Sequence, residues 1–245
     1  MNPTIETMQS HRSIRKFKEK AIADEILESI LKAAQCAATS NFIQAYTIIR
    51  VDDPDNRKTI AELCGTQPWI LQAPIFLVFC ADVNRLGMAC QKHGKKMVAG
   101  YAEQFIVATV DTALVAQNTL LAAESLGLGG VFIGAIRNDP AMVCECLNIP
   151  QNAFPVFGMC LGYPDDDPPR KPRLPLKAVL KKDAYSQKGD DVLLDEYDTL
   201  IQTYYRTRDT HQREDTWCKQ MAGFANRVIR PHIKSFLKSK GFWLR

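Results

Sequence analysis

The 245-residue sequence lacks the short motifs that identify the most common enzyme classes. It has no P-loop, no HExxH and no GxSxG, which excludes the usual phosphotransfer, zinc-protease and serine-hydrolase arrangements. A glycine-rich stretch at residues 127–130 follows a predicted helix and precedes a predicted strand. A dinucleotide-binding fingerprint has the opposite order, so the sequence does not predict a Rossmann domain.

Long uninterrupted apolar runs are also absent. Residues 63–81 and 146–164 carry no charge, but both contain prolines and polar amides, so neither predicts a membrane-spanning helix. The first residues, MNPTIETMQSHR, do not combine a basic start with an apolar core, and they predict no secretory signal. We expect a cytoplasmic protein that does not bind membranes.

The eight cysteines are scattered and never form a CxxC pair. Cys144 and Cys146 are two residues apart in a predicted helix, where side chains at this spacing do not face each other. A chain of this length can bury its core without disulfides. We therefore expect reduced thiols and no metal site.

The composition is that of an ordinary globular protein, with 46% hydrophobic and 24% charged residues. Short apolar runs predict strands at residues 46–51, 75–80, 131–133 and 156–161. Apolar residues at helical spacing predict helices at 24–34, 59–64, 100–126, 142–147, 193–205 and 216–240. Asp24 is expected to cap the first of these helices. The pattern favours an α+β fold, in which a sheet lies between helices.

Three further features concern local backbone and charge. Gly127, Gly129 and Gly130 are expected to end the long helix by adopting positive φ. Residues 163–175 hold five prolines and predict an irregular segment. Residues 206–245 hold ten Lys or Arg and three acids, a net charge of +7 against −3 for the rest. A phosphate-bearing partner or a solvated helix face would explain this charge. Few aromatics are interleaved, which argues against nucleic-acid binding.

Three local sequences could carry binding chemistry. HRSIR, residues 11–15, holds two arginines that can bind a phosphate or a carbonyl-bearing ring through paired hydrogen bonds. KPRLP, residues 171–175, holds Lys171 and Arg173 on a segment that its prolines keep extended. In residues 127–135, Gly134 can let the backbone approach a flat ligand closely. Taken singly, HRSIR and KPRLP are better explained as ordinary basic surface segments than as binding sites.

Together, HRSIR, LGLGGVFIGAIRN, FGMCLGYP and KPRLP, in this order, resemble the nitroreductase superfamily. RDTW and a late Arg-Pro make the likeness closest to its oxygen-insensitive NADPH nitroreductase and flavin reductase group (type A). The resemblance runs from about Pro3 to the end of the chain. It implies a single domain over residues 1–245 with a basic helical extension from about residue 190. It also implies a central, mostly antiparallel sheet and an intertwined homodimer.

The resemblance further implies one non-covalent FMN in each of two interfacial sites. The residues that match its isoalloxazine, ribityl and phosphate contacts are His11, Arg12, Ser13 and Arg15. Lys171 and Arg173 match a loop on the phosphate side, and Gln67 matches a polar group near the ring. A hydroxyl-rich run is matched by Thr39, Ser40 and Asn41, and the backbone beside flavin N5 by Phe132, Ile133, Gly134 and Ala135. Asn41 and Ala135 replace residues common in relatives, which can reshape the acceptor pocket.

NADPH and substrate contacts are implied as well. Arg208 matches a residue for the 2′-phosphate of NADPH, with Arg213 close after it. Arg230 matches an arginine at the pocket mouth, and Arg227 lies nearby. Asn41 and Phe42 are included among the substrate-side residues. The other basic residues are expected on solvated faces, and His93, His211 and His232 are expected to be structural or surface residues.

The implied activity is a ping-pong oxidoreduction in which NADPH passes a hydride to flavin N5, and a nitroaromatic, quinone or flavin is then reduced. No side chain is expected to be catalytic, because the cofactor carries the chemistry. Arg12 or Arg15 is expected to stabilise negative charge on the reduced flavin. Two alternatives stay open. One is a flavin reductase that supplies reduced FMN to a partner, and the other is a flavin-binding or nucleic-acid-binding protein without turnover.

Overall fold

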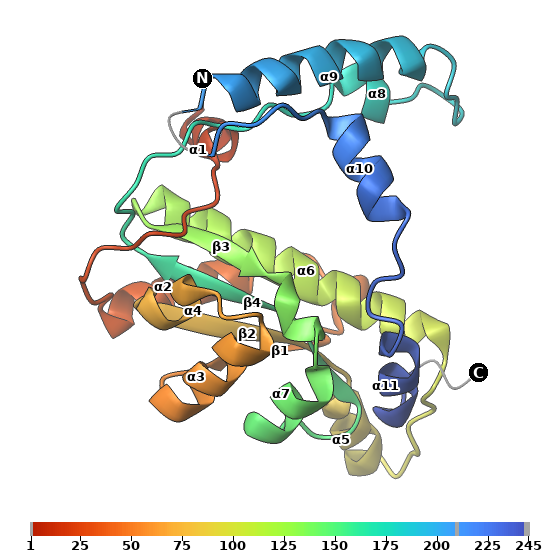
Figure 1. The fold of residues 1–245 in the computed structure, drawn as a ribbon. Helices are drawn as coiled ribbons and strands as arrows, with labels where there is room; N and C mark the ends of the chain where they lie inside the picture. The colour runs from red at the N-terminus through yellow and green to blue at the C-terminus, as the bar shows by residue number, and fades with distance from the viewer. Residues whose placement is uncertain (1, 209–210, 243–245) are drawn as a thin grey trace. The chain divides into compact units, whose positions relative to one another are not determined.

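A computed structural model describes residues 2–208 and 211–242 (Figure 1). The strands are β1 (Tyr46–Arg50), β2 (Ile75–Asp82), β3 (Gly129–Ile133) and β4 (Ala153–Gly162). The helices before β3 are α1 (Pro3–Ser10), α2 (Asp24–Ala34), α3 (Pro54–Leu63), α4 (Pro68–Gln72), α5 (Asn84–Lys92) and α6 (Ala102–Ser125). The later ones are α7 (Pro140–Cys146), α8 (Leu176–Val179), α9 (Asp190–Arg206), α10 (Trp217–Ala225) and α11 (Ile233–Ser239). Two compact units result: the first comprises the described residues up to Asp167 and from Arg230 on, and the second comprises Pro168–Ile229.

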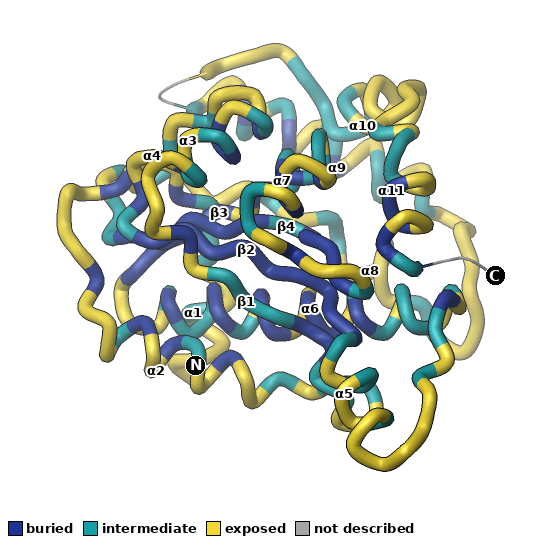
Figure 2. Tube along the Cα trace, turned by 90° about the horizontal axis from the view of Figure 1, so that it is seen from below, coloured by how far each residue is buried: buried dark blue, intermediate teal, exposed yellow. Residues whose placement is uncertain are grey.

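The first unit is built on one four-stranded sheet with the order β1-β2-β4-β3, and every neighbouring pair is antiparallel. All eight residues of β2 are buried (Figure 2). Phe76 and Val78 belong to one apolar cluster, whereas Leu77 and Phe79 belong to another, as the two-residue period of a strand requires. The sheet is therefore covered on both faces, which confirms the predicted sandwich and its antiparallel order.

Helix α6 covers one face of the sheet, where its buried Val115 and Leu120 join α2 and the odd-numbered residues of β2 in one cluster. Among the described residues, α6 is the one helix long and apolar enough to cross a membrane. It nevertheless carries Asp111, which is fully buried in the first unit. This agrees with the sequence, which predicts a core helix here because acidic residues interrupt the apolar run.

The predicted elements are largely confirmed, with differences at helix ends. Helix α3 begins at Pro54, five residues before the predicted start at Thr59, because Asp53 accepts a hydrogen bond from the Asn56 N–H at 2.8 Å and caps it. The prediction that Asp24 caps α2 is wrong. Ala23 is the N-cap, and the Asp24 carboxylate instead pairs with Arg50 at 2.5 Å.

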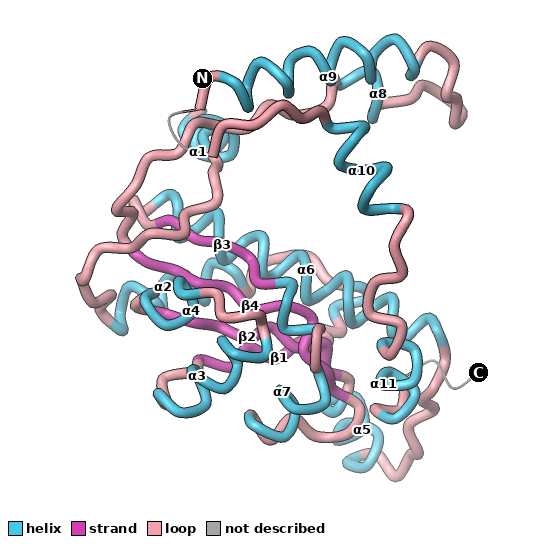
Figure 3. Tube along the Cα trace, in the orientation of Figure 1, coloured by secondary structure: helices cyan, strands magenta, loops and turns pink. Residues whose placement is uncertain are grey.

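The predicted helix over residues 216–240 is wrong, because two helices occur there. Figure 3 shows the loop between α10 and α11. Arg230 has a φ of +50°, and Pro231 follows, so a continuous helix cannot pass this point. The second unit is thus three helices, α8 to α10, on an irregular segment, with a small core of Tyr197, Ile201 and Tyr205.

The glycines after α6 also differ from expectation. Gly127 has a φ of +76°, as predicted, but Gly129 and Gly130 lie in β3 and are not among the residues with positive φ. Glycine is required at both positions because there is no room for a side chain. A Cβ on Gly129 would lie 2.5 Å from Ile14 Cγ1, and a Cβ on Gly130 would lie 2.7 Å from the Cys160 carbonyl oxygen. These glycines therefore allow close packing of neighbouring segments.

Candidate functional site

The HRSIR segment runs beside the sheet in the first unit. After α1 the chain becomes extended, and the Ile14 N–H donates to the Gly130 carbonyl at 3.0 Å. Ile14 is buried, whereas Ser13 is half-buried and Arg15 exposed. Because alternate residues of an extended chain point to opposite sides, Ser13 and Arg15 project away from the core that Ile14 enters. The segment is therefore held rigidly while its polar side chains remain available.

Two polar side-chain contacts hold the start of this segment. His11 Nδ1 lies 2.6 Å from Glu124 Oε1, near the end of α6. Arg12 pairs with Asp167 and donates from Nη1 to the Ser10 carbonyl at 3.2 Å. Arg12 Nε is buried and has no hydrogen-bond partner among the described residues. A buried donor of this kind is expected to bind a ligand group or water.

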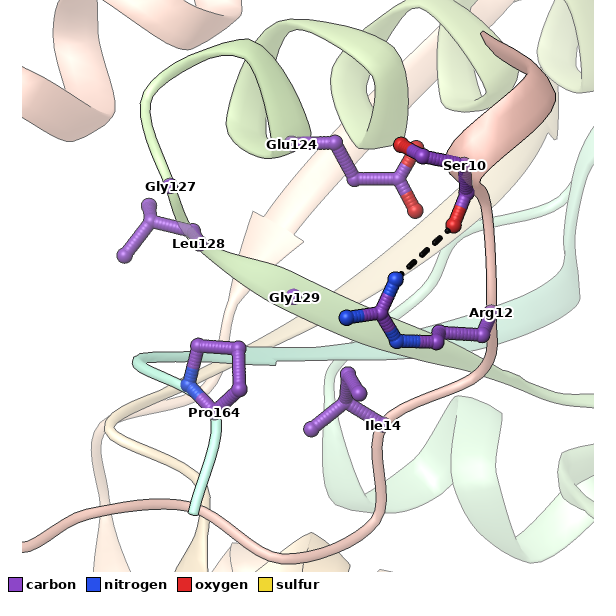
Figure 4. Close-up of a pocket in the computed structure, with 8 residues that line it drawn as sticks. All are labelled: Ser10, Arg12, Ile14, Glu124, Gly127, Leu128, Gly129 and Pro164. Carbon is purple, nitrogen blue, oxygen red and sulfur yellow. Dashed lines mark hydrogen bonds between the residues drawn. The ribbon is translucent and has the colours of Figure 1, made fainter. Parts of the chain in front are cut away.

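A small cavity of about 200 Å³ lies beside Arg12 (Figure 4). Its lining residues are Ser10, Arg12, Ile14, Glu124, Gly127, Leu128, Gly129 and Pro164. In Figure 4 the Glu124 carboxylate points toward Ser10 and Arg12. Pockets that enclose a whole cofactor-sized ligand measure about 300–1,000 Å³. The cavity can therefore enclose only part of such a ligand.

Gln67 and Trp69 lie at the start of α4, where Arg15 approaches the Trp69 ring. Gln67 is the N-cap residue of this helix, and its Nε2 donates to the Cys64 carbonyl at 3.2 Å. Arg15 Cζ lies 5.8 Å from the centre of the Trp69 ring, a cation–π distance. Trp69 Nε1 is a second buried donor without a hydrogen-bond partner in the described part of the chain. This group offers a guanidinium, an amide and an indole N–H.

The stretch Phe132 to Ala135 leaves the sheet at the end of β3. Ile133 is buried, and Phe132 is partly exposed with its ring edge-on to Phe157, centroids 5.1 Å apart. Gly134 and Ala135 are half-buried in the 3₁₀ turn Gly134–Arg137.

Arg230 lies beside that turn, because its Nε donates to Asn138 Oδ1 at 3.0 Å. Asn138 in turn donates to the Leu63 carbonyl at the end of α3. His232 contacts the Arg137 carbonyl at 3.2 Å, so its prediction as a structural residue is in keeping with this contact.

Thr39 to Phe42 are held elsewhere in the first unit. Asp111 on α6 accepts from the Ser40 N–H at 3.0 Å. Asp111 and Glu124 are 13 residues apart on α6, which corresponds to about 20 Å along the helix axis. The anchor of this loop and the anchor of His11 are therefore well separated within one chain.

The second unit gathers predicted cations around tyrosines. Lys171 Nζ lies 5.3 Å from the Tyr205 ring centre, and Arg213 Cζ lies 4.0 Å from the same ring. Arg208 Cζ lies 5.7 Å from the ring of Tyr204. Lys171 and Arg213 thus meet, although they are far apart in the sequence.

Charge in this cluster affects its tyrosines. Burial alone raises the pKa of Tyr205, but hydrogen bonds with Lys171, Gln220 and Arg213 outweigh it and lower the pKa below its ordinary value. Burial raises the pKa of Tyr197, and the positive charge of Arg173 opposes this change. A cluster that lowers a phenol pKa has a positive potential and suits an anionic ligand. Arg227 is exposed in the loop after α10.

The basic residues outside the predicted site are mainly exposed, as expected, but Lys240 is an exception. It is buried, and its Nζ donates to the Ile149 carbonyl at 2.8 Å. The prediction of a solvated face is wrong for this residue, because its ammonium group ties α11 to the segment before β4.

The cysteines do not provide a nucleophile at the sheet. All eight are free, and burial raises the pKa of Cys64 to about 11. Burial also raises the pKa of Cys80 and Cys160 in the paired strands β2 and β4. These thiols stay protonated and unreactive near neutral pH.

Several site-forming residues were not identified from the sequence. Glu124, Asp167 and Trp69 contact HRSIR, and Asp111 holds the loop after α2. Tyr205 is the centre of the cationic cluster. A signal existed for two of them, because Asp111 and Glu124 are acids within an apolar helix. Their partners are 71 and 113 residues away in sequence and could not be read from it.

Comparison with known proteins agrees with these features. Residues 8–163 match the nitroreductase family, and residues 171–245 match the nitroreductase family C-terminal domain. An NADPH-flavin oxidoreductase of Vibrio harveyi is 42% identical over 242 residues, 98% of either chain. An oxygen-insensitive NADPH nitroreductase of Salmonella typhimurium is 42% identical over 245 residues, with 100% of each chain covered. The solved structure of an NADPH:FMN oxidoreductase from Vibrio harveyi, complexed with NAD+, covers 100% of both chains with a TM-score of 0.91 and 40% identity.

Proposed function

This chain belongs to the nitroreductase family, and we propose that it is an FMN-dependent NADPH oxidoreductase that reduces nitroaromatics, quinones or related planar acceptors. The observation that carries the proposal is the full-length similarity to relatives named for NADPH, for flavin and for nitro compounds. The site geometry supports it, because two buried donors, Arg12 Nε and Trp69 Nε1, have no hydrogen-bond partner among the residues that the structure describes.

The residues present fit FMN. The Nε donor of Arg12, with no hydrogen-bond partner among the described residues, suits a phosphate or a ring carbonyl. Arg15, Trp69 and Gln67 form a second polar group that suits the flavin ring. In the second unit, the resemblance assigns Lys171 and Arg173 to the phosphate side of the cofactor, and Lys171 lies against the Tyr205 ring. His11, Ser13 and the stretch from Phe132 to Ala135 complete the proposed contacts.

When bound, FMN supplies the acceptance and donation of hydride. The side chains of the protein would bind and orient the cofactor and balance its charge. Arg12 or Arg15 would stabilise the negative charge that the flavin gains on reduction, which favours the reduced state. Glu124 orients the His11 imidazole, because its Oε1 accepts a hydrogen bond from the imidazole Nδ1. No side chain in this scheme is a catalytic acid, base or nucleophile.

Discrimination for NADPH is assigned to the second unit. Arg208 at the end of α9 carries a guanidinium that suits the 2′-phosphate, which NADH lacks. Arg213 and Arg227 add positive charge along the same unit, and Arg230 lies beside the Gly134–Arg137 turn of the first unit.

A homodimer completes the proposed site. Ile106, Val110 and Leu114 on α6 are 51%, 48% and 43% exposed and repeat every four residues, which forms an apolar ridge on one side of the helix. Such ridges occur in subunit interfaces. Thr39 to Phe42 are anchored about 20 Å from His11 along α6. We therefore assign Thr39, Ser40, Asn41 and Phe42 to the site shared with a second copy.

The single domain over residues 1–245, with a helical extension from about residue 190, stays a prediction, as does the cytoplasmic location.

The test is anaerobic reduction. The purified protein is expected to be yellow, to bleach when NADPH is added, and to regain colour when a nitroaromatic or a quinone follows. A colourless protein that takes up no FMN would overturn the proposal.

The second candidate, delivery of reduced FMN to a partner, is favoured by the relative named as an NADPH-flavin oxidoreductase. Gel filtration after reduction separates the two, because only a delivery enzyme loses its flavin.

A further inference from the structure

Asp111 is a buried acid that the proposed chemistry does not use. It lies in the middle of α6, and its exposed fraction is 0%. Its two carboxylate oxygens accept from the backbone N–H groups of Ser40 and Ala45, each at 3.0 Å. An ionised group in a protein core is unfavourable unless it is well hydrogen-bonded. The two donors come from opposite ends of one short loop, so Asp111 holds both ends of this loop.

The loop of residues 39–45 has unusual backbone geometry. Asn41, Phe42 and Gln44 have φ values of +47°, +57° and +55°. Non-glycine residues rarely adopt this left-handed conformation, and it persists only where the surroundings enforce it. Phe42, at the centre, is 82% exposed. The structure therefore maintains a strained loop that keeps a phenyl ring in solvent.

Other contacts keep the loop attached but do not duplicate this role. Thr39 Oγ1 accepts from the Gln44 N–H at 3.3 Å within the loop. Arg85 donates to the carbonyls of Gln44 and Tyr46 at the β1 end. Of these contacts, only that of Asp111 connects the loop to α6. Its carboxylate accepts a hydrogen bond from the Ser40 N–H, and Ser40 immediately precedes the residues with left-handed backbone.

We propose that Asp111 is a positioning residue that fixes the 39–45 loop and, through it, presents the Phe42 ring to planar aromatic acceptors. This proposal rests on the proposed oxidoreductase function. An exposed phenyl ring held on rigid backbone can stack on a flat ring with little loss of conformational freedom. The Asp111 carboxylate holds the backbone of residues 39–45 in its strained conformation, and this backbone determines the position of the Phe42 ring.

Asp111→Asn is the informative variant, because it keeps the shape of the side chain. The amide offers one acceptor oxygen, and its NH2 group faces the other backbone N–H, so one hydrogen bond is lost. Thr119→Val is the matched control. Thr119 is also fully buried on α6, but its hydroxyl donates only to the Val115 carbonyl of the same helix. It tests general loss of stability without touching the loop.

The first measurement is loop order in the holoprotein. Chymotrypsin cleavage after Phe42 is expected to become about tenfold faster in Asp111→Asn, and to stay unchanged in Thr119→Val, since local opening scales with the lost hydrogen bond. Hydrogen exchange of the wild-type protein is independent of any variant. The Ser40 and Ala45 amides are expected to be protected, and free exchange of both would overturn the proposal.

The second measurement is the KM for two acceptors. Asp111→Asn and Phe42→Ala are each expected to raise the KM for a nitrobenzoate about tenfold, and to raise the KM for ferricyanide, which is not planar and cannot stack on a phenyl ring, by much less. If Asp111 acts through Phe42, the double variant matches Phe42→Ala alone. Multiplied effects, or equal changes for both acceptors, would overturn the proposal. A wild-type protein that reduces neither acceptor would refute the oxidoreductase function, while the cleavage result would still report on Asp111.

Discussion

Gly129→Ala tests whether close packing at β3 sets the position of the HRSIR segment. The added Cβ would lie 2.5 Å from Ile14 Cγ1, 3.0 Å from Ile14 Cβ and 3.1 Å from Pro164 Cγ. Ordinary contacts begin near 3.4 Å, so Ile14 has to retreat by roughly 1 Å, and overpacking of this kind costs about 1–3 kcal/mol. For a chain of this size, each kcal/mol lowers the Tm by about 2–4 °C.

The functional consequence follows from the neighbours of Ile14. Ser13 and Arg15 flank it, and its N–H donates to the Gly130 carbonyl. A shift of Ile14 therefore moves both polar side chains away from their proposed FMN contacts. We expect a Tm about 2–12 °C lower and a Kd for FMN at least about tenfold higher, since displacements of this size disrupt precisely positioned polar contacts.

The assay is fluorescence titration of the apoprotein with FMN, together with thermal unfolding of the same preparation. Gly223→Ala is the control, because a Cβ there meets nothing within 4 Å; it should leave the Kd unchanged. Ile14→Ala combined with Gly129→Ala removes the shortest contact, that with Cγ1, but keeps those with Ile14 Cβ and Pro164 Cγ, and it is expected to recover part of the FMN affinity. If Gly129→Ala binds FMN and unfolds like the wild type, the close approach does not position this segment.

Three further predictions concern single side chains. Arg12→Ala and Lys171→Ala are each expected to lower the fraction of protein purified with FMN, and two fully yellow variants would contradict the assigned contacts. Arg208→Ala should raise the KM for NADPH about tenfold and leave that for NADH unchanged, since only NADPH carries the 2′-phosphate; equal effects would refute this role. Burial alone raises the pKa of Asp198, but hydrogen bonds from the Cys218 backbone outweigh it and lower the pKa. A lowered carboxyl pKa stabilises the fold above the unfolded value of 3.8, so the Tm deficit of Asp198→Asn should vanish as the pH falls below it, and a deficit that is independent of pH would contradict this.

The sheet could be predicted because its strands are short apolar runs. The run from Ile75 to Cys80 has no polar residue, which favours a strand covered on both faces, and all eight residues of β2 are buried. The long helix was equally clear, because the apolar spacing from about residue 100 to 126 repeats at the helical period. Helix starts were less clear, since Asp53 and Pro54 predict a turn as readily as a cap.

The candidate site was predicted only in part. HRSIR and KPRLP were identified because clustered arginine and lysine residues stand out in any sequence. The residues that hold them were not identified. Tyr205 is an ordinary helix residue in the sequence, and Glu124, although an acid within an apolar helix, gives no sign of which residue it contacts. Only folding brings Glu124 to His11, across 113 residues, and brings Lys171 and Arg213 to one phenol ring.

By itself, the sequence determined the secondary structure of the core and the family to which the chain belongs, because periodicity and ordered motifs are local properties. Tertiary structure decided why Gly129 and Gly130 are glycines and what Asp111 does inside an apolar helix. These depend on close approach and hydrogen bonding between distant segments. Such contacts form only when the chain packs. The sequence does not show which distant group will accept a hydrogen bond from a given backbone N–H, or will lie where a glycine lacks a Cβ.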